Sequence, residues 1–169
     1  MEKVALTLER PSLALFPSFR TALAEEQAEG NHLDLTPEAL PAHIAALLAR
    51  SHDVKPGRVP ETVYWGVVDG EYIGRVSLRH VLNPHLEQWG GHIGYQVRPS
   101  RRGRGYGHAL LAGVLPQARA LGLERALLHC DETNVASARV IEGAGGVFAG
   151  QTPNLERDGA PGRAYWIAL

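Results

Sequence analysis

A glycine-rich loop between a strand-like run and a helix-like run is the feature that most constrains the fold of this chain. The strand-like run spans residues 92–97, and the helix-like run spans residues 109–115. Between them, Gly103, Gly105 and Gly107 stand at alternate positions. Glycine lacks a Cβ, so the backbone can turn tightly there and approach a ligand closely. The pattern predicts a strand, a tight loop and a helix whose first turn faces a bound group.

The same loop carries the charge of an anion site. The first N–H groups of a helix have no partner inside the helix and carry partial positive charge, which favours a bound phosphate or pyrophosphate. Four arginines lie between Arg98 and Arg104 and add to the positive field. A solvated basic turn before an ordinary helix is the simpler alternative. We favour the anion site because glycine spacing, charge and strand–helix context agree.

Two common nucleotide-binding motifs do not fit this loop. A Walker loop ends in Gly-Lys-Ser or Gly-Lys-Thr, and the loop has no such ending. A dinucleotide fingerprint that begins at Gly103 would need a glycine where the chain has His108. The phosphate-bearing ligand is therefore expected to be of another class.

The pattern that fits is Arg102-x-x-Gly105-x-Gly107, preceded by Val97-Arg98-Pro99. It resembles the pyrophosphate loop of the GNAT superfamily of acetyl-CoA-dependent N-acetyltransferases. Asn134-x-x-Ser137 after the next strand, followed by Gly145-Gly146, extends the resemblance. The run from Gly91 to Arg102 is similar to a bacterial subgroup of predicted acetyltransferases. The resemblance is specific from about residue 64 to the C-terminus.

Length and composition set further bounds. With 169 residues, 44% of them hydrophobic, the chain is expected to form a single domain over residues 1–169 with a substantial core. A net charge of −1 argues against bulk nucleic-acid binding. One cysteine, Cys130, excludes an intramolecular disulfide and suits a reducing cytoplasm, where we place the protein. We expect no signal peptide and no membrane span, since no apolar run approaches roughly 18 residues.

Hydrophobic periodicity and turn residues predict the order of elements. Asp69-Gly70 between two alternating runs is a typical hairpin turn, and Thr36 followed by Pro37 indicates a helix start. Pro116 should kink the longest helix at a cost of about 3 kcal/mol. The expected strands cover residues 4–8, 62–68, 71–78, 92–97, 125–130, 147–149 and 163–169, the expected helices cover 12–29, 36–50, 109–121 and 134–142, and loops are expected at 51–60, 79–91 and 152–162.

The resemblance implies a three-layer α+β fold, the GNAT-like acyl-CoA N-acyltransferase fold. A mixed, mostly antiparallel sheet flanked by helices would splay open between the fourth and fifth strands, residues 92–97 and 125–130. These two strands would run parallel, joined by the crossover helix. Splaying would leave backbone N–H and C=O groups free for a ligand.

The resemblance also implies a cofactor site for acetyl-CoA as co-substrate, with no metal. The pantetheine amides would pair with the backbone of Tyr95, Gln96 and Val97 like an added strand. Asn134 and Ser137 would complete the site, although asparagine is also a favoured helix N-cap. The pyrophosphate would lie on the loop and the first helical turn, formed by Arg102, Gly103, Arg104, Gly105, Tyr106, Gly107 and His108.

The implied chemistry is direct attack of an amine on the thioester in a ternary complex, with a backbone N–H of residues 95–97 polarising the carbonyl. An ammonium must first lose a proton. Relatives often place a glutamate on one of the two central strands, where this chain has His92 and His129. Each could be the base because histidine titrates near neutrality, and a buried structural role is the alternative we favour for each. Glu87 and Asp131 are further candidates from nearby loops.

The sequence departs from the family at the expected acid. Many relatives have a tyrosine seven residues after the asparagine to protonate the CoA thiolate, and that position here is Ile141. Ser137 or water would then act, or no acid is needed because a thiol with a pKa of about 8.5 is a tolerable leaving group. Cys130 could be a nucleophile, but a lone strand cysteine is more often a small buried hydrophobe.

The predicted function is transfer of an acetyl group from acetyl-CoA to an amine of an unidentified small molecule, peptide or protein. A non-catalytic acyl-CoA-binding module or sensor of the same fold is the alternative, because the usual tyrosine is replaced. The N-terminal helices and residues 79–91 should shape the acceptor site. The predicted partners are acetyl-CoA and the amine, without membrane or nucleic acid, and a homodimer is left open.

Overall fold

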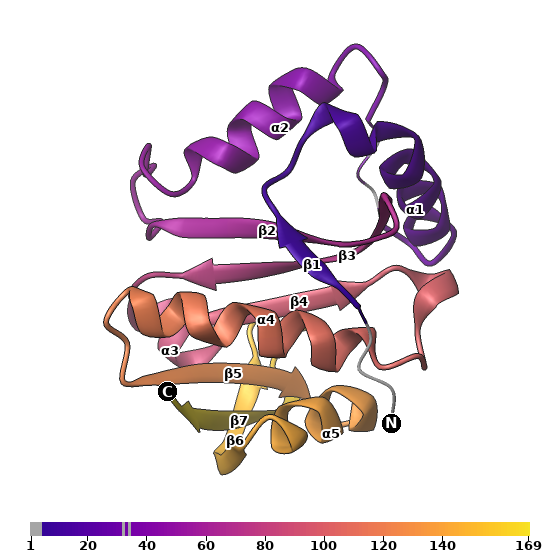
Figure 1. Ribbon diagram of the computed structural model, residues 1–169. Coiled ribbons are helices and arrows are strands. Elements are labelled where there is room, and N and C mark those ends of the chain that lie inside the picture. The colour runs from indigo at the N-terminus through magenta and orange to yellow at the C-terminus, as the bar shows by residue number, and fades with distance from the viewer. Residues whose placement is uncertain (1–4, 32, 34) are drawn as a thin grey trace.

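Two antiparallel sheets form the framework of the computed structural model, which describes residues 5–31, 33 and 35–169 (Figure 1). In the first sheet the strand order is β1-β2-β3-β4, and in the second it is β5-β7-β6. The first sheet contains β1 (Thr7–Glu9), β2 (Glu61–Val68), β3 (Glu71–Arg79) and β4 (Ile93–Val97), and the second contains β5 (Arg125–Asp131), β6 (Gly146–Asn154) and β7 (Ala160–Ala168).

Helices cover both faces of the first sheet and one face of the second. Helix α1 packs against β3, and α2 packs against β2. On the opposite face, α4 packs against β1, β3 and β4. Helix α4 also contacts α5, which packs against β5 and β6. The helical elements are η1 (Leu13–Leu15), α1 (Phe16–Ala28), α2 (Leu40–Ala49), α3 (Pro84–Gln88), η2 (Pro99–Arg101), α4 (Tyr106–Ala120) and α5 (Val135–Gly143). The expected three-layer α+β architecture is confirmed.

Two hydrophobic clusters fill the layers. One lies under α4 and includes Val76, Leu110 and Val114, each fully buried. The other lies under α1 and α2, where the Phe19 ring stacks on Trp65 with ring centroids 4.6 Å apart. Because strand side chains alternate between faces, β3 sends Val76 to the α4 side and Arg75 to the α1–α2 side.

The β2–β3 hairpin follows from its turn residues. Asp69 and Gly70 both have positive φ, 49° and 76°, as a two-residue hairpin turn of this kind requires. The predicted hairpin is confirmed, and its strands extend by one residue at Glu61 and at Arg79. A register shift between Gly66 and Val67 had no signal in the sequence.

The sheet opens between β4 and β5, which point in the same direction in Figure 1. The two strands meet only at one end. There the His92 N–H donates to Leu127 O (2.8 Å) and the Leu127 N–H donates to His92 Nδ1 (2.9 Å). Gly91 has φ 64°, and a Cβ at that position would collide with the Leu127 carbonyl. Beyond this point β4 and β5 belong to separate sheets, so the predicted splay between the fourth and fifth strands is confirmed.

Several predicted boundaries were wrong. The second helix begins at Leu40, and Thr36 instead accepts the Ala39 N–H at its Oγ1 (3.3 Å) in a preceding turn. The loop expected at 79–91 contains α3, which is capped by Asn83 Oδ1 accepting the Leu86 N–H (2.9 Å). The first strand begins at Thr7, and position 4 lies outside the described residues.

The last hairpin is longer than predicted. β6 continues to Asn154 and β7 begins at Ala160, so only residues 155–159 connect them. The local sequence of residues 152–162 indicates a loop. Pairing between the two strands, including Pro153 opposite Pro161, nevertheless keeps the ends of this segment in an extended conformation. In the described part of the chain, no helix combines the length and the apolar character that crossing a bilayer requires.

Candidate active site

A cavity of about 650 Å³ lies where β4, the glycine-rich loop and α5 meet. We call it the first cavity. It brings together most of the residues that the sequence assigned to a cofactor, while Arg104 is not among those that line it. The lining consists of Tyr95, Gln96, Val97, Arg101, Arg102, Gly103, Gly105, Tyr106, Gly107, His108, Asn134, Ala136, Ser137, Arg139 and Val140.

The loop presents unpaired backbone donors to this cavity. Gly103 and Gly105 have φ of 72° and 81°, left-handed conformations that favour glycine. The helical bonding of α4 begins with the Ala109 N–H, which donates to Gly105 O (3.1 Å). The N–H groups of the three residues before Ala109, at positions 106–108, therefore have no partner within the described chain. They form the positive end of a helix fifteen residues long.

The arginines of the loop do not supply the field that the sequence suggested. Arg98 is buried, 3% exposed, and binds the carboxylates of Glu25 and Glu71. Arg101 also binds Glu71, with Nη2 at 2.7 and 2.9 Å from the two oxygens. The Arg98 guanidinium lowers the pKa of Glu25 to about 2, with burial opposing it and Ser100 adding to it.

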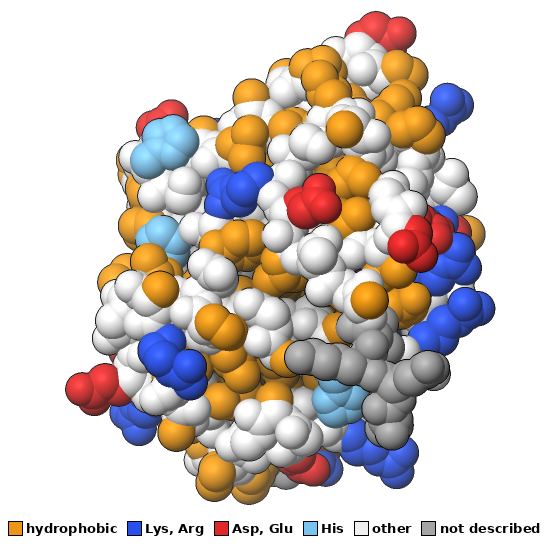
Figure 2. Space-filling model, in the orientation of Figure 1, with side chains coloured by type: hydrophobic (Ala, Val, Ile, Leu, Met, Phe, Trp, Pro, Cys, Tyr) orange, Lys and Arg blue, Asp and Glu red, His pale blue; other side chains and the backbone are white. Residues whose placement is uncertain are grey.

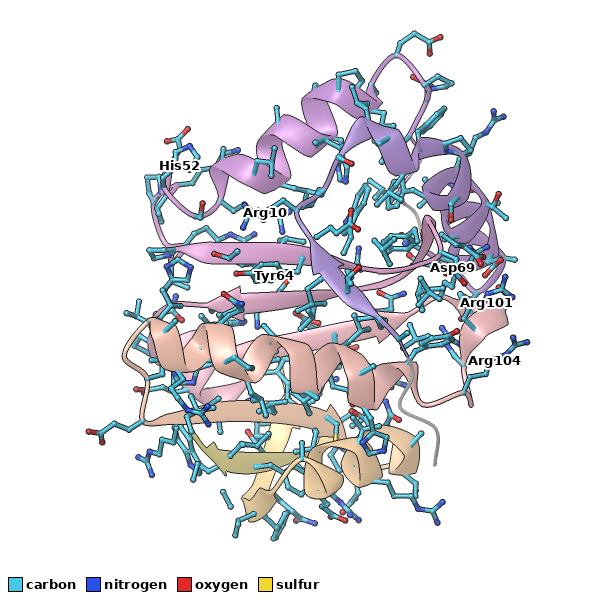
Figure 3. The ribbon with its side chains drawn as sticks, viewed as in Figure 1. Arg10, His52, Tyr64, Asp69, Arg101 and Arg104 are labelled. Carbon is cyan, nitrogen blue, oxygen red and sulfur yellow. The ribbon has the colours of Figure 1, made fainter. Side chains whose placement is uncertain are left out.

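Arg102 completes this set, since it binds both oxygens of Glu29 at 2.9 Å. Three of the four arginines are thus neutralised by carboxylates of α1, of its C-cap residue Glu29 and of β3, and they fasten the loop to the rest of the fold. Arg104 is exposed and extends away from the protein in Figure 3. Figure 2 shows basic and acidic side chains next to each other at this edge. An anion in the first cavity would therefore meet mainly the backbone donors.

A hydroxyl pair spans the opening between the sheets. Tyr95 Oη on β4 lies 2.9 Å from Ser137 Oγ on α5. Asn134 caps α5 by accepting the Ser137 N–H at Oδ1 (3.0 Å), as its N-cap reading predicted. Its Nδ2 has no partner among the described residues, and the residue lines the first cavity. Burial raises the pKa of Tyr95, and its bond to Ser137 opposes this.

The two candidate histidines have different surroundings. His92 is 6% exposed, and its Nδ1 accepts the Leu127 N–H, so the neutral ring carries its proton on Nε2. Burial, then Arg125 and Arg79, lower its pKa. Protonation at Nδ1 would break a bond that joins β4 to β5.

His129 lies on β5 beside Trp89, with ring centroids 5.4 Å apart. Both of its ring nitrogens are buried and lack a hydrogen-bond partner among the described residues. Burial, then the charge of Arg79, lowers its pKa to about 4. The ring is therefore neutral at physiological pH, with its lone pair uncommitted.

The remaining sequence candidates lie elsewhere. Asp131 accepts bonds from Asn154 Nδ2 (2.6 Å) and Arg157 Nη1 (2.7 Å), which tie it to the β6–β7 hairpin. Glu87 is exposed on α3. Cys130 is 5% exposed, and burial raises the pKa of its thiol, in keeping with the buried-hydrophobe interpretation. Ile141 is fully buried in the core under α4.

A second cavity, of about 430 Å³, lies on the other face of β4 under α1 and α2. It shares Tyr95 and Gln96 with the first cavity. Its remaining lining residues are Phe19, Leu33, His43, Leu47, Arg50, Glu61, Val63, Trp65, Arg75, Ser77, Arg79 and Gly94. Sequence reasoning missed His43 and Arg75. The alternation of Arg75, Ser77 and Arg79 along one strand was the signal that could have found this polar face.

Residues 5–147 match the family described as the acetyltransferase (GNAT) domain. The chain therefore belongs to the GNAT acetyltransferase family, as the glycine-rich loop and the split sheet indicated. A comparison with curated protein sequences finds no match. Among the described residues, no group of three or more potential ligands is placed to hold a metal ion.

Solved structures share the fold over almost the whole chain. One is the Salmonella typhimurium acetyl transferase that modifies the N-terminal serine of ribosomal protein L7/L12 (TM-score 0.72, 17% identity, 99% of this chain and 96% of that chain). Another is the microcin C7 self-immunity acetyltransferase MccE with acetyl-CoA and AMP (0.75, 13%, 99% and 94%). A third is Mycobacterium smegmatis RimJ with CoA-disulfide (0.73, 20%, 97% and 82%).

Proposed function

We propose that this protein binds acetyl-CoA in the first cavity and transfers its acetyl group to an amine in the second cavity. The observation that carries this proposal is that β4 borders both cavities through Tyr95 and Gln96. In the transfer, the amine nitrogen bonds to the thioester carbon and the carbon–sulfur bond breaks. Sulfur leaves with the electron pair, and the amine gives up a proton. Direct attack in a ternary complex needs this kind of two-sided access.

The cofactor would be held mainly by backbone groups. The pyrophosphate would accept hydrogen bonds from the N–H groups at positions 106–108. Along β4, the edge that faces β5 has no ladder beyond His92, so residues 95–97 can pair with the two pantetheine amides. Asn134 Nδ2 is free to donate to the same arm. A backbone N–H of this segment would polarise the thioester carbonyl.

We assign proton removal to His129 and a structural role to His92. The lone pair of His92 Nδ1 is occupied by the Leu127 N–H, whereas neither nitrogen of His129 has a hydrogen-bond partner in the described part of the chain. His129 is not among the lining residues of either cavity, but Arg79 lines the second cavity and its charge contributes to the lowered pKa of His129. With its low pKa, His129 would hold the proton only briefly before passing it to water.

We assign protonation of the CoA thiolate to Ser137, supplied by Tyr95. Ile141 is buried away from the first cavity, so the position where many relatives carry a tyrosine has no access to sulfur here. The Tyr95–Ser137 pair borders that cavity and holds two exchangeable protons. A serine hydroxyl backed by a phenol can give its proton to sulfur and recover one from the tyrosine.

The test measures acetyl-CoA affinity by calorimetry and CoA release with a thiol reagent over a panel of amines. We expect micromolar-range binding, an order of magnitude typical of substrates, together with CoA release that depends on the amine. Binding without release on any amine would favour the sensor alternative. Absence of acetyl-CoA binding would overturn the proposal.

A further inference from the structure

The floor of the second cavity is built in rows across β2, β3 and β4. One row consists of Val63, Ser77 and Gly94, which stand directly opposite one another on neighbouring strands. The neighbouring row consists of Trp65, Arg75 and Gln96. Side chains in both rows face α1 and α2, because strand residues two apart share a face. On this floor, open space above Gly94 therefore lies one row away from the guanidinium group of Arg75.

Gly94 keeps the floor open beside the splayed edge. Among the described residues, a Cβ built there would have only Arg79 Nη1 within 4 Å, at a distance of 4.0 Å. Space above this residue is continuous with the cavity that the residue lines. An amine lying over Gly94 would be next to the backbone of Tyr95, where the proposed transfer takes place.

Positive charge dominates the described lining of the second cavity. Its lining contains three arginines and one carboxylate. The arginines are Arg50, Arg75 and Arg79, and the carboxylate belongs to Glu61. Arg50 Nη1 lies 3.2 Å from Glu61, and Arg79 Nε lies 3.6 Å from the same carboxylate. Arg79 also donates to the carbonyls of residues 90 and 91, at 3.1 and 3.2 Å. Two of the three arginines are therefore already occupied.

Arg75 is the arginine with donors to spare. Its Nη2 donates to Gln96 Oε1 (2.7 Å), and no carboxylate of the described residues lies within 4 Å of its guanidinium. A guanidinium has five N–H donors in a planar fork that matches a carboxylate or phosphate. The side chain is half-buried, where a charge without a counter-ion is costly. Its placement suits an anionic group brought by a ligand.

One wall of the cavity is apolar. The Phe19 and Trp65 rings, together with Leu47 and Val63, form this wall. His43 stacks beside Phe19, with ring centroids 6.4 Å apart. Burial, then Arg50 and Arg75, lowers the pKa of His43, so this ring adds no charge at neutral pH. A ligand that matches these surfaces has an apolar body and an anionic end.

We propose that the acceptor is a small amine that also carries a carboxylate or phosphate-like group, which Arg75 binds while the amine lies over Gly94. A volume of about 430 Å³ is of the size that holds an amino acid or a similar small molecule. The inference rests on the proposed function, since it names the acceptor class of the same site. The anionic group would fix the orientation of the amine and exclude neutral amines.

The experiment compares CoA release from acetyl-CoA in the presence of four matched amines: phenylalanine, its phosphonate analogue, phenylalaninamide and phenethylamine. Rates are compared at equal concentrations of free amine. We expect kcat/KM for the anionic members to exceed that of the neutral ones by at least about tenfold, since a charge-assisted bidentate contact is lost otherwise. Preference for the phosphonate over the carboxylate, or the reverse, identifies which anion the site takes.

Arg75→Gln should remove this preference, raising KM for the anionic amine by about tenfold or more while the Kd for acetyl-CoA stays unchanged. Arg75→Lys should keep part of the preference, because it retains charge without the fork. Arg119→Gln removes one exposed positive charge on α4 and is the matched control. Binding of the N-acetylated product, followed by tryptophan fluorescence, gives a readout independent of turnover.

Neutral amines that react as well as anionic ones would overturn this inference and leave the proposed function standing. So would equal effects of Arg75→Gln and Arg119→Gln on the anionic amine. Acetyl-CoA binding without release on any amine would overturn both. The wild-type comparison decides the matter even if Arg75→Gln does not fold.

Discussion

Tyr95 Oη on β4 lies 2.9 Å from Ser137 Oγ on α5, so a hydroxyl pair joins the two halves of the split sheet beside the first cavity. Tyr95 belongs to the first sheet, whereas Ser137 belongs to the helix that covers the second sheet. Both residues line the first cavity. The contact holds α5 against β4, and in the proposed mechanism the same two hydroxyls supply the proton for the CoA thiolate. Variants of the two residues distinguish these roles.

Tyr95→Phe and Ser137→Ala should each lower kcat by about tenfold or more while leaving the KM for acetyl-CoA near its wild-type value, because general-acid contributions are of at least this order. Tyr95→Phe keeps the ring that packs near Gly107, so the melting temperature should change little. Rapid-quench assays with acyl-CoA substrates measure the effect. Wild-type kcat in both variants would show that water protonates the thiolate.

Ile141→Tyr should not restore an acid. Ile141 is fully buried among core residues, and its Cγ2 and carbonyl lie against Gly146. A phenol at this position would overpack the core and destabilise the fold by about 1–3 kcal/mol. Urea unfolding of the variant measures the cost. An unchanged unfolding midpoint combined with higher kcat would mean that the new side chain reaches the cavity and that our placement of the acid is wrong.

Features set by local chemistry could be predicted from the sequence. The turn at Asp69-Gly70 needs two positive φ values, and few residue pairs adopt them easily. Asn134 caps α5 because its side chain reaches an N–H three residues on. Gly103 and Gly105 adopt the left-handed conformations that an alternating glycine pattern suggests. Each of these signals is complete within a few neighbouring residues.

Features that depend on distant partners could not be predicted. The charges near the glycine-rich loop looked available for a phosphate, yet Arg98 and Glu25, which pair across the fold, stand 73 residues apart in the sequence. The second cavity likewise needs α2, β3 and β4 to meet before His43 and Arg75 share a space. A single sequence shows the residue types but not these pairings.

Gly103→Asp should weaken acetyl-CoA binding by about tenfold, because a negative charge beside the loop opposes the pyrophosphate through about 1.4 kcal/mol of screened repulsion. Gly103 has φ 72° with nothing within 4 Å of its Cβ position, and Asp and Asn both tolerate this conformation. Gly103→Asn is therefore a neutral control of equal size and should bind nearly as the wild type does. Calorimetry at two salt concentrations measures both. Equal loss in the two variants would mean that shape, not charge, matters at this position.

Gly94→Val should separate cofactor binding from acetyl transfer. The residue has ordinary strand backbone, and open space lies at its Cβ position, so the sheet can accept valine. The new side chain would fill the second cavity next to the transfer point and lower kcat/KM for the amine by about a hundredfold, the order expected when reactants are displaced by an ångström or more. The Kd for acetyl-CoA should stay within about twofold. Loss of acetyl-CoA affinity in a folded Gly94→Val protein would contradict the two-sided arrangement.

The pH dependence of stability should report His129. Its pKa falls from 6.5 in the unfolded chain to about 4 in the fold. Between these values the unfolded state binds more protons, so stability present above pH 6.5 is lost as the pH falls toward 4. One such proton can contribute at most about 1.4 kcal/mol per pH unit, and partial access of water to the ring reduces this. Urea unfolding of wild type and His129→Phe should show a shallower loss in the variant, with the remainder due to groups such as His92.

The same variant tests the base. His129→Phe keeps a ring beside Trp89 but has no lone pair, so kcat/KM should fall by roughly a hundredfold if His129 takes the proton. For the wild type, kcat/KM is calculated from the concentration of free amine and plotted against pH. It should be flat near neutral pH and decline only toward pH 4, where the ring becomes charged. Wild-type kcat/KM in a folded His129→Phe protein would remove histidine from proton transfer. The low pKa of His129 would then belong to a buried structural residue, and water would take the proton of the amine.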